Sequence, residues 1–213
     1  MLCNDQQSFK GMLQKMMLFI FLIASNGIVN AQHKDSIPAY STFLKEIEEG
    51  DLDIDYRQFR ISYIYSKEFK NKTDANYYNL KDEVFKYIQK KRYKKILDVC
   101  HRMLKVDYTS MFAHKYIQQT AKIIGDTLQY KKHHDIEFGL LKSIVHNGDG
   151  KSCETAWEVT QIEEEYFILR MMRAQLNMQM LDGGCDRMEV TQDNKEKVVF
   201  FGIYYVFESR VRD

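Results

Sequence analysis

The sequence predicts an α+β protein in which N-terminal helical hairpins pack on a small, mainly antiparallel C-terminal sheet. As far as residue 146, apolar residues recur at the three- and four-residue spacing of amphipathic helices. From Gln175 onward they alternate with polar residues, as in strands with one buried face. Between the two patterns lie Asn147, Gly148, Asp149 and Gly150. We expect this segment to be a structural turn, because glycine and asparagine tolerate positive φ angles.

Residues 1–31 are predicted to form a signal peptide. An uncharged apolar run at 16–24 follows two lysines, and the segment ends in the small-x-small pattern Val-Asn-Ala. We therefore expect cleavage between Ala31 and Gln32. The run is far shorter than the roughly 20 residues that span a bilayer. The mature protein is thus expected to be soluble, without a transmembrane segment, and either periplasmic or secreted.

Composition and charge limit the classes of function. The chain has 213 residues, of which 45% are hydrophobic and 29% charged, and this suffices for a packed core. The leader holds two lysines and one aspartate of the 31 basic and 30 acidic side chains, so its removal leaves 29 of each sign. A balanced surface offers no electrostatic footprint for nucleic acid, and we expect no nucleic-acid partner.

The first helices are predicted from their boundaries. Residues 32–52 are expected to be a linker and a short helix that ends at Gly50, and residues 53–146 to be the helical part. Asp55 stands where it can cap the next helix. Two helical hairpins follow, with helices expected at 80–91 and 93–104, and then at 110–124 and 126–145.

The two hairpins repeat with a fixed period. Their second helices open 34 residues apart, at Arg92 and Asp126, which is the period of tetratricopeptide repeats. Such an array needs about three units to be stable alone, so we expect the helices to pack on another element. Most aromatic residues of the helices, including Phe85 and Phe112, fall on stripes that are predicted to face the core.

Residues 147–213 are predicted to form an α+β part that belongs to one structural unit with the helices. An extended segment near Trp157 and a helix at 163–172 precede two alternating segments, which turns at 182–184 and 192–196 delimit. The segment 198–207 is apolar on both faces, so we expect a strand that is buried on both sides.

Three cysteines follow the leader: Cys100, Cys153 and Cys185. Cys100 lies on the apolar face of a predicted helix, where it would be a small core residue. Cys153 and Cys185 lie in the C-terminal part and could form a disulfide if their Cα atoms lie within about 7 Å. The sequence leaves this pairing open.

Two ligand-binding interpretations of the segment around Lys151 fail. The Gly-Lys-Ser sequence at 150–152 resembles the end of a phosphate-binding loop, but Val145 stands where that loop needs its first glycine. A calcium-loop spacing that begins at Asn147 places Lys151 at a ligand position, where a cation opposes a metal ion. We expect no cofactor and no metal ion, and keep Lys151 as a weak site candidate.

Glu163, Glu164 and Tyr166 are further weak site candidates. Paired carboxylates serve acid–base chemistry, but the helix dipole also favours glutamates in a first helical turn, and capping is the stronger interpretation. The adjacent His133 and His134 point about 100° apart on a helix and cannot chelate one ion together. His101 and His114 have no recognisable partner spacing, and no serine or cysteine has the setting of a nucleophile. We therefore expect no catalytic residue, although an enzymatic function stays open.

Several motifs occur in a characteristic order within residues 53–207: GDGKSCETAWEV at 148–159, EEEYFILRMM at 163–172, Asp186 with an apolar segment, and FFGI at 200–203. In this order they resemble an exported bacterial family known as domain of unknown function 4919. The resemblance implies a fold family and an exported location, but no activity, so no catalytic residue is transferred. The chain departs from the family pattern at Cys153, Cys185 and Gly202.

These observations favour an exported cell-envelope protein that acts as a binding or scaffold module, with another envelope protein or a peptide as its partner. Helical hairpins of this period present a concave face to partners. The alternative is an envelope hydrolase or another enzyme with an unrecognised active site. The sequence leaves open the ligand, any catalytic activity, the oligomeric state, and the start among Met1, Met12 and Met16.

Overall fold

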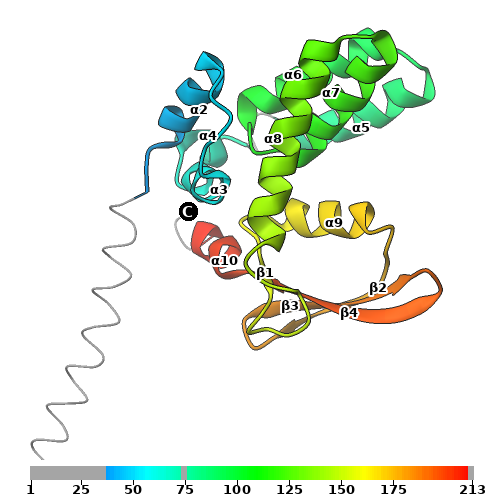
Figure 1. The fold of residues 1–213 in the computed structure, drawn as a ribbon. Coiled ribbons are helices and arrows are strands. Elements are labelled where there is room, and N and C mark those ends of the chain that lie inside the picture. Colours follow the sequence, from blue (N-terminus) through cyan, green and yellow to red (C-terminus); the bar gives the residue numbers. More distant parts are fainter. Residues whose placement is uncertain (1–36, 73–75, 211–213) are drawn as a thin grey trace, which may run out of the picture. The chain divides into compact units, whose positions relative to one another are not determined.

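The computed structural model describes residues 37–72 and 76–210 (Figure 1). The predicted signal peptide and its cleavage point at Ala31 and Gln32 lie outside the described residues. From Pro38 onward the chain forms one compact unit. Most of its helices precede a four-stranded sheet, so the predicted α+β class is confirmed. In the described part of the chain, no helix combines the length and the apolar character that crossing a membrane requires.

Three short helices begin this unit: α2 (Tyr40–Glu49), α3 (Tyr56–Ile64) and α4 (Lys67–Lys70). Helix α2 ends at Gly50, whose φ of 92° lies in the left-handed region that favours glycine. The Asp55 carboxylate caps α3 by accepting a hydrogen bond of 3.0 Å from the Gln58 N–H.

Two helical hairpins follow, formed by α5 (Tyr77–Gln89) with α6 (Tyr93–Val106) and by α7 (Met111–Ile124) with α8 (Thr127–Val145). The side chains of Ser110 and Asp126 cap α7 and α8, as the turn chemistry of serine and aspartate favours. Helices α5, α6 and α7 share an apolar core of their own, made of Tyr77, Leu80, Val84, Ile96, Val99, Cys100, Met103, Leu104, Ala113 and Ile117.

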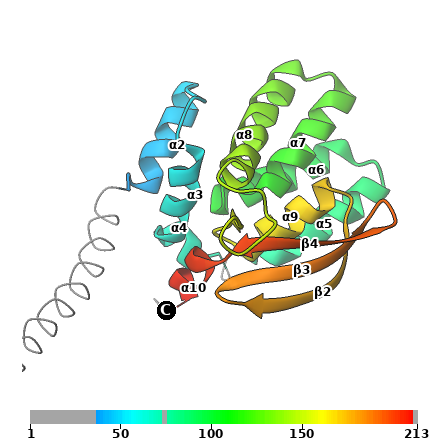
Figure 2. The same cartoon turned by 60° about the horizontal axis from the view of Figure 1, so that its bottom comes forward.

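Helix α9 (Ile162–Met171) connects the hairpins to the sheet, because it contacts both α7 and β2. The strands are ordered β1-β4-β3-β2. Strands β2 (Gln175–Asp182), β3 (Cys185–Gln192) and β4 (Lys195–Gly202) are antiparallel, and the short β1 (Trp157–Glu158) is parallel to β4. Figure 2 shows the three long strands side by side. The main core packs sheet residues such as Met188 and Phe201 against α9 and the N-terminal helices.

The prediction of one strand across 198–207 is wrong. Strand β4 ends at Gly202, and helix α10 (Tyr204–Arg210) follows. Gly202 pairs with Cys185, where β3 begins, and with Glu158, where β1 ends. A strand beyond Gly202 would leave its backbone groups unpaired, whereas a helix satisfies them internally. The expected burial of both faces is also wrong, since the Val198 side chain is 38% exposed.

A disulfide joins Cys153 to Cys185, whose Cα atoms lie 5.8 Å apart. It ties the segment after the glycine-rich turn to the first residue of β3. Within that turn, Gly150 has a φ of 66°, and its carbonyl oxygen accepts a hydrogen bond of 2.9 Å from the Phe200 N–H. The φ of Gly148 is not positive. Instead, a Cβ atom at Gly148 would collide with the carbonyl oxygen of Thr155.

Candidate functional site

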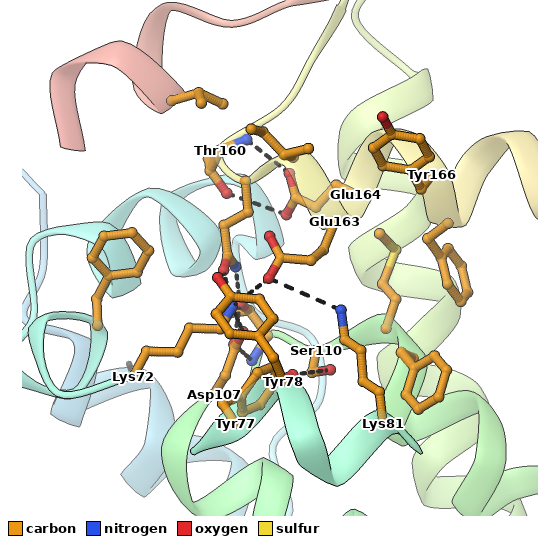
Figure 3. Close-up of a pocket in the computed structure, with 18 of the residues that line it drawn as sticks. Lys72, Tyr77, Tyr78, Lys81, Asp107, Ser110, Thr160, Glu163, Glu164 and Tyr166 are labelled. Carbon is orange, nitrogen blue, oxygen red and sulfur yellow. Dashed lines mark hydrogen bonds and ion pairs between the residues drawn. The ribbon is translucent and has the colours of Figure 1, made fainter. Parts of the chain in front are cut away.

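A cavity of about 660 Å³ lies where the helical hairpins meet α9 (Figure 3). Its walls come from segments far apart in the sequence: the end of α4, one face of α5, the loop between α6 and α7 with the start of α7, helix α9 along its length, and α10. The volume lies within the range of small-molecule sites, which are usually formed in advance of binding.

The floor of this cavity consists of Lys72, Asp107, Thr109, Gln161 and Glu163, and the buried ammonium group of Lys72 holds these side chains together. Lys72 is only 5% exposed, and its Nζ donates to three side-chain oxygens: Gln161 Oε1 at 2.6 Å, and Asp107 Oδ2 and Glu163 Oε1 at 3.1 Å each. A lysine has three N–H donors, so all of them are used. Burial by itself lowers the pKa of Lys72, but Asp107 and Glu163 outweigh burial and raise the pKa to about 12. Lys72 is therefore charged and fully engaged.

The acceptors around Lys72 are fixed by further hydrogen bonds. Asp107 Oδ1 accepts from the N–H and the hydroxyl of Thr109, at 2.9 and 2.6 Å. Gln161 Nε2 donates to Thr109 Oγ1 at 3.2 Å. The loop between α6 and α7 is thereby joined to the start of α9. Because these groups satisfy one another, the floor leaves few free donors or acceptors for a ligand.

Glu164 lines another side of the cavity and forms a buried ion pair with Arg60. Its Oε2 accepts from Arg60 Nη1 at 2.8 Å and from the Thr160 N–H at 2.7 Å. Arg60 is fully buried, and its Nε donates to Ser143 Oγ at 2.9 Å. Burial raises the pKa of Glu164, while Arg60 acts against this rise. The pair connects the first turn of α9 with α3 and α8.

The remaining walls combine cations with aromatic rings. Lys81 Nζ lies 4.0 Å from Glu163 Oε1, and Figure 3 shows Lys72 and Lys81 approaching Glu163 from two sides. The same Nζ lies 5.8 Å from the ring centroids of Tyr77 and Tyr78 and 5.9 Å from that of Phe112. Burial lowers the pKa of Lys81; Glu163 opposes this effect and the Lys72 charge adds to it.

Arg170 is the second cation of these walls. Its guanidinium carbon lies 5.7 Å from the Phe85 ring centroid, and it forms no ion pair with any residue that the structure describes. Arg170 is close enough to Lys81 to contribute to the lowered pKa of that lysine. Lys81 and Arg170 therefore lie near each other among aromatic rings.

A family model described as "Domain of unknown function (DUF4919)" matches residues 28–212. The chain belongs to this family. The resemblance inferred from the sequence motifs is therefore confirmed. No curated protein and no solved structure matches the chain. All residues of the cavity lie within the DUF4919 match, so the site is part of the family's domain.

The cavity of this DUF4919 protein contains three of the four weak candidates. Glu163, Glu164 and Tyr166 line it. Tyr166 is 43% exposed, and its hydroxyl donates to Gln179 Oε1 at 2.7 Å. Lys151 lies elsewhere, on the exposed turn, with its Nζ 3.0 Å from Asp149 Oδ2.

Sequence reasoning missed Lys72, Lys81 and Asp107, and it misassigned Phe85. Phe85 was expected to face the core, but it lines the cavity and is 37% exposed. Phe112 packs against the core of α5, α6 and α7 as expected, and it also lines the cavity. One signal was present: Tyr77, Lys81 and Phe85 are spaced by four residues and so share one face of α5. Lys72 and Asp107 lie outside helices, and no local pattern marks them.

Two histidines without a predicted partner meet outside the cavity. His114 Nδ1 lies 2.8 Å from His133 Nδ1, and His114 Nε2 lies 2.8 Å from the Tyr108 carbonyl oxygen. Because a carbonyl only accepts, His114 carries its proton on Nε2, and His133 Nδ1–H donates to His114 Nδ1. Burial lowers the pKa of His114 to about 3 and that of His133 to about 4, so both are neutral. Among the residues described, no three His, Cys, Asp or Glu side chains are grouped as metal ligands.

Glu165 has surroundings unlike those of its two neighbours. It is fully buried, and neither carboxyl oxygen has a hydrogen-bond partner in the described part of the chain. Asp186 of β3 is close enough to disfavour ionisation of this carboxyl group. Burial, with contributions from Asp186 and Glu164, raises the pKa of Glu165 to about 8. At neutral pH this carboxyl group is mostly protonated.

Proposed function

We propose that this protein is an exported binding module of the cell envelope, and that the cavity beside α9 receives a small ligand or the end of a partner polypeptide. The observation that carries the proposal is the division of the cavity into two parts. Its floor is closed by internal hydrogen bonds around Lys72. Its walls expose aromatic rings together with Lys81 and Arg170. A preformed concave site with few polar anchors is typical of ligand binding.

Two observations support the exported location. The leader pattern at 1–31, with cleavage between Ala31 and Gln32, is that of a signal peptide. The Cys153–Cys185 disulfide adds to this, because disulfides persist in oxidising compartments such as the periplasm. N-terminal sequencing of the fractionated protein should find Gln32 first. Cytoplasmic protein that retains residues 12–31 would contradict the proposal.

The volume of the cavity limits the kind of occupant. About 660 Å³ suits a drug-sized molecule or a few residues of a peptide, not a folded domain. A protein partner would therefore insert a chain end or a loop, which agrees with the proposed peptide or envelope-protein partner.

The enzymatic alternative rests on one observation, namely that Glu163 and Glu164 both line the cavity. Acid–base catalysis needs a carboxyl group that faces the substrate. Glu164 is committed to Arg60 and Thr160, and Glu163 accepts from Lys72. The described lining also contains no histidine or cysteine. Binding is therefore the better-supported function, whereas turnover in a hydrolase screen that is lost in Glu163→Gln would favour the alternative.

Ligand screening of the mature protein, residues 32–213, tests the binding function. Thermal-shift and native mass-spectrometry screens with envelope peptides and small metabolites should reveal a ligand. Phe85→Ala, in the cavity wall, should weaken its binding. Phe138→Ala, at a 59% exposed site on α8 that does not line the cavity, is the matched control and should have no effect. Equal binding by both variants would place the ligand elsewhere and refute the role of the cavity.

A further inference from the structure

Building on the proposed binding function, we infer that the cavity selects an organic anion in which a carboxylate is attached to a flat apolar group. Lys81 and Arg170 would hold the carboxylate, and the rings of Tyr78, Phe85 and Phe112 would contact the apolar group. The free acid of a small aromatic molecule and the C-terminal residue of a polypeptide share this chemistry.

The sign of the ligand charge follows from how the cavity charges are paired. Four cationic side chains, Lys70, Lys72, Lys81 and Arg170, line the cavity with three acids. One of the acids, Glu164, is already neutralised by Arg60 from outside the lining. The other two share Lys72, and one of them, Glu163, also lies 4.0 Å from Lys81 Nζ. Four cations against these two acids leave a positive excess, to which Lys81 and Arg170 both contribute.

A cationic ligand would be poorly accommodated. Its best partner would be Glu163, whose Oε1 already lies 3.1 Å from Lys72 Nζ and 4.0 Å from Lys81 Nζ. A third cation there would compete with the floor and be repelled by both lysines. An anion near Lys81 would instead relieve an ammonium group that burial destabilises, as its lowered pKa indicates.

The apolar part of the ligand follows from the surroundings of the two cations. Lys81 lies among three aromatic rings, and Arg170 lies over a fourth, that of Phe85. A ligand that reaches both cations must therefore displace water from aromatic surface. A flat apolar group gains from this contact, whereas a small inorganic anion would leave the rings uncovered.

The arrangement of α9 places these elements together. Glu163, Tyr166, Phe167 and Arg170 follow the spacing of one helix face, and all four line the cavity. Lys81 and Phe85 approach from the matching face of α5. Two rigid helices thus hold the cations and the rings, so that the site needs little reorganisation on binding.

Isothermal titration calorimetry on the mature protein, with three probes of one shape, tests the inference. The probes are 3-phenylpropionate, its neutral amide and 2-phenylethylammonium. We expect the carboxylate to bind at least about tenfold more tightly than the amide, since hydrogen bonds to charged groups exceed neutral ones by that order. The ammonium probe should bind most weakly. Acetyl-glycyl-phenylalanine and its C-terminal amide then distinguish a polypeptide end from a free acid as the natural source.

Substitutions of Lys81 and Arg170 test whether these two cations cause the preference for the carboxylate probe. Lys81→Met and Arg170→Met should each weaken carboxylate binding about tenfold and leave amide binding unchanged. Lys81→Arg should retain the preference for the carboxylate. Lys86→Met, which removes a lysine of α5 that does not line the cavity, is the control and should bind like the wild type.

The outcomes separate this inference from the binding function itself. If the amide or the ammonium probe binds as tightly as the carboxylate, and Phe85→Ala weakens that binding, the cavity is a binding site but the charge selection is wrong. If none of the probes binds at millimolar concentration, the inference is overturned, while ligands from the broader screen decide the binding function independently.

Discussion

The two sides of helix α9 differ in the partners that they offer to adjacent glutamates. On one side the carboxylates have cationic partners, and on the other the carboxyl group has none. On the cavity side, Glu163 and Glu164 are paired with Lys72 and Arg60. Glu165 follows them directly in the sequence but lies between α9 and the sheet, where it has no hydrogen-bond partner among the described residues. Burial opposes ionisation of Glu163, yet Lys72 and Lys81 outweigh it and lower its pKa, while the pKa of Glu165 rises to about 8. Partners contributed by distant segments of the chain, not position in the first turn, decide the charge.

The comparison also explains why one side of α9 is a candidate site and the other is core. Paired charges can line a cavity, because their solvation is replaced by fixed partners. An unpaired carboxyl group is tolerated in the interior only in its neutral form. The cavity side therefore exposes charged groups to a ligand. The sheet side holds a buried carboxyl group whose ionisation makes the stability of the fold depend on pH.

The largest effect is expected when a cavity-side glutamate loses its partner. Arg60→Met leaves Glu164 buried without a cation, as Glu165 is, and should reduce the free energy of unfolding by about 3–5 kcal/mol. Chemical denaturation measures this loss. The control is Arg57→Met on the same helix, where the pair with Glu158 is about 30% exposed and should contribute about 1 kcal/mol or less. Equal losses in both variants would mean that burial of the pair has no special role.

The pH dependence of stability tests the sheet side. Glu165 ordinarily has a pKa of 4.5 and is raised to about 8 in the fold, so the folded state holds a proton that the unfolded state releases. Stability should therefore fall as the pH rises from about 4.5 to about 8. Glu165→Gln removes this titration and should be more stable than the wild type above that range, by on the order of 3 kcal/mol.

Denaturation curves at several pH values check this prediction. Glu196→Gln, at an exposed position of β4, serves as the control and should follow the wild type. If the Glu165→Gln profile runs parallel to the wild-type profile, the buried carboxyl group is ionised in the fold and the contrast across α9 fails.

The smallest effect, with the opposite sign in pH, is expected for Glu163. Its lowered pKa means that it stabilises the fold above its ordinary pKa and that this contribution disappears as the pH falls through the lowered value. Its side chain is 29% exposed, and Lys72 keeps Asp107 and Gln161 as partners. Glu163→Gln should thus cost about 1 kcal/mol or less at neutral pH and nothing in acid. Thermal melts at neutral and acid pH would show a loss that persists in acid if this interpretation is wrong.

The sequence by itself determined the elements whose signals are local. Helix ends at Gly50 and Gly125 and caps at Asp55, Ser110 and Asp126 follow from backbone conformation and short-range hydrogen bonds, which neighbouring residues decide. In β2 the expected buried face is absent, since every residue except Leu176 is exposed. In β3, however, the buried Met188 and Val190 alternate with Glu189, as one buried and one exposed sheet face require. The helix boundaries and the alternation in β3 were predictable without knowledge of any long-range contact.

Only the tertiary structure decided what depends on distant partners. The end of β4 at Gly202 is determined by where β1 ends and where β3 begins, which no property of 198–207 reveals. The cavity joins Lys72, Asp107 and Glu163 across up to 91 residues of sequence. The pKa of Glu163 is lowered, whereas those of Glu164 and Glu165 are raised, for the same reason. Burial and ion pairing act through space, so three identical neighbours acquire different chemistry once the chain has folded.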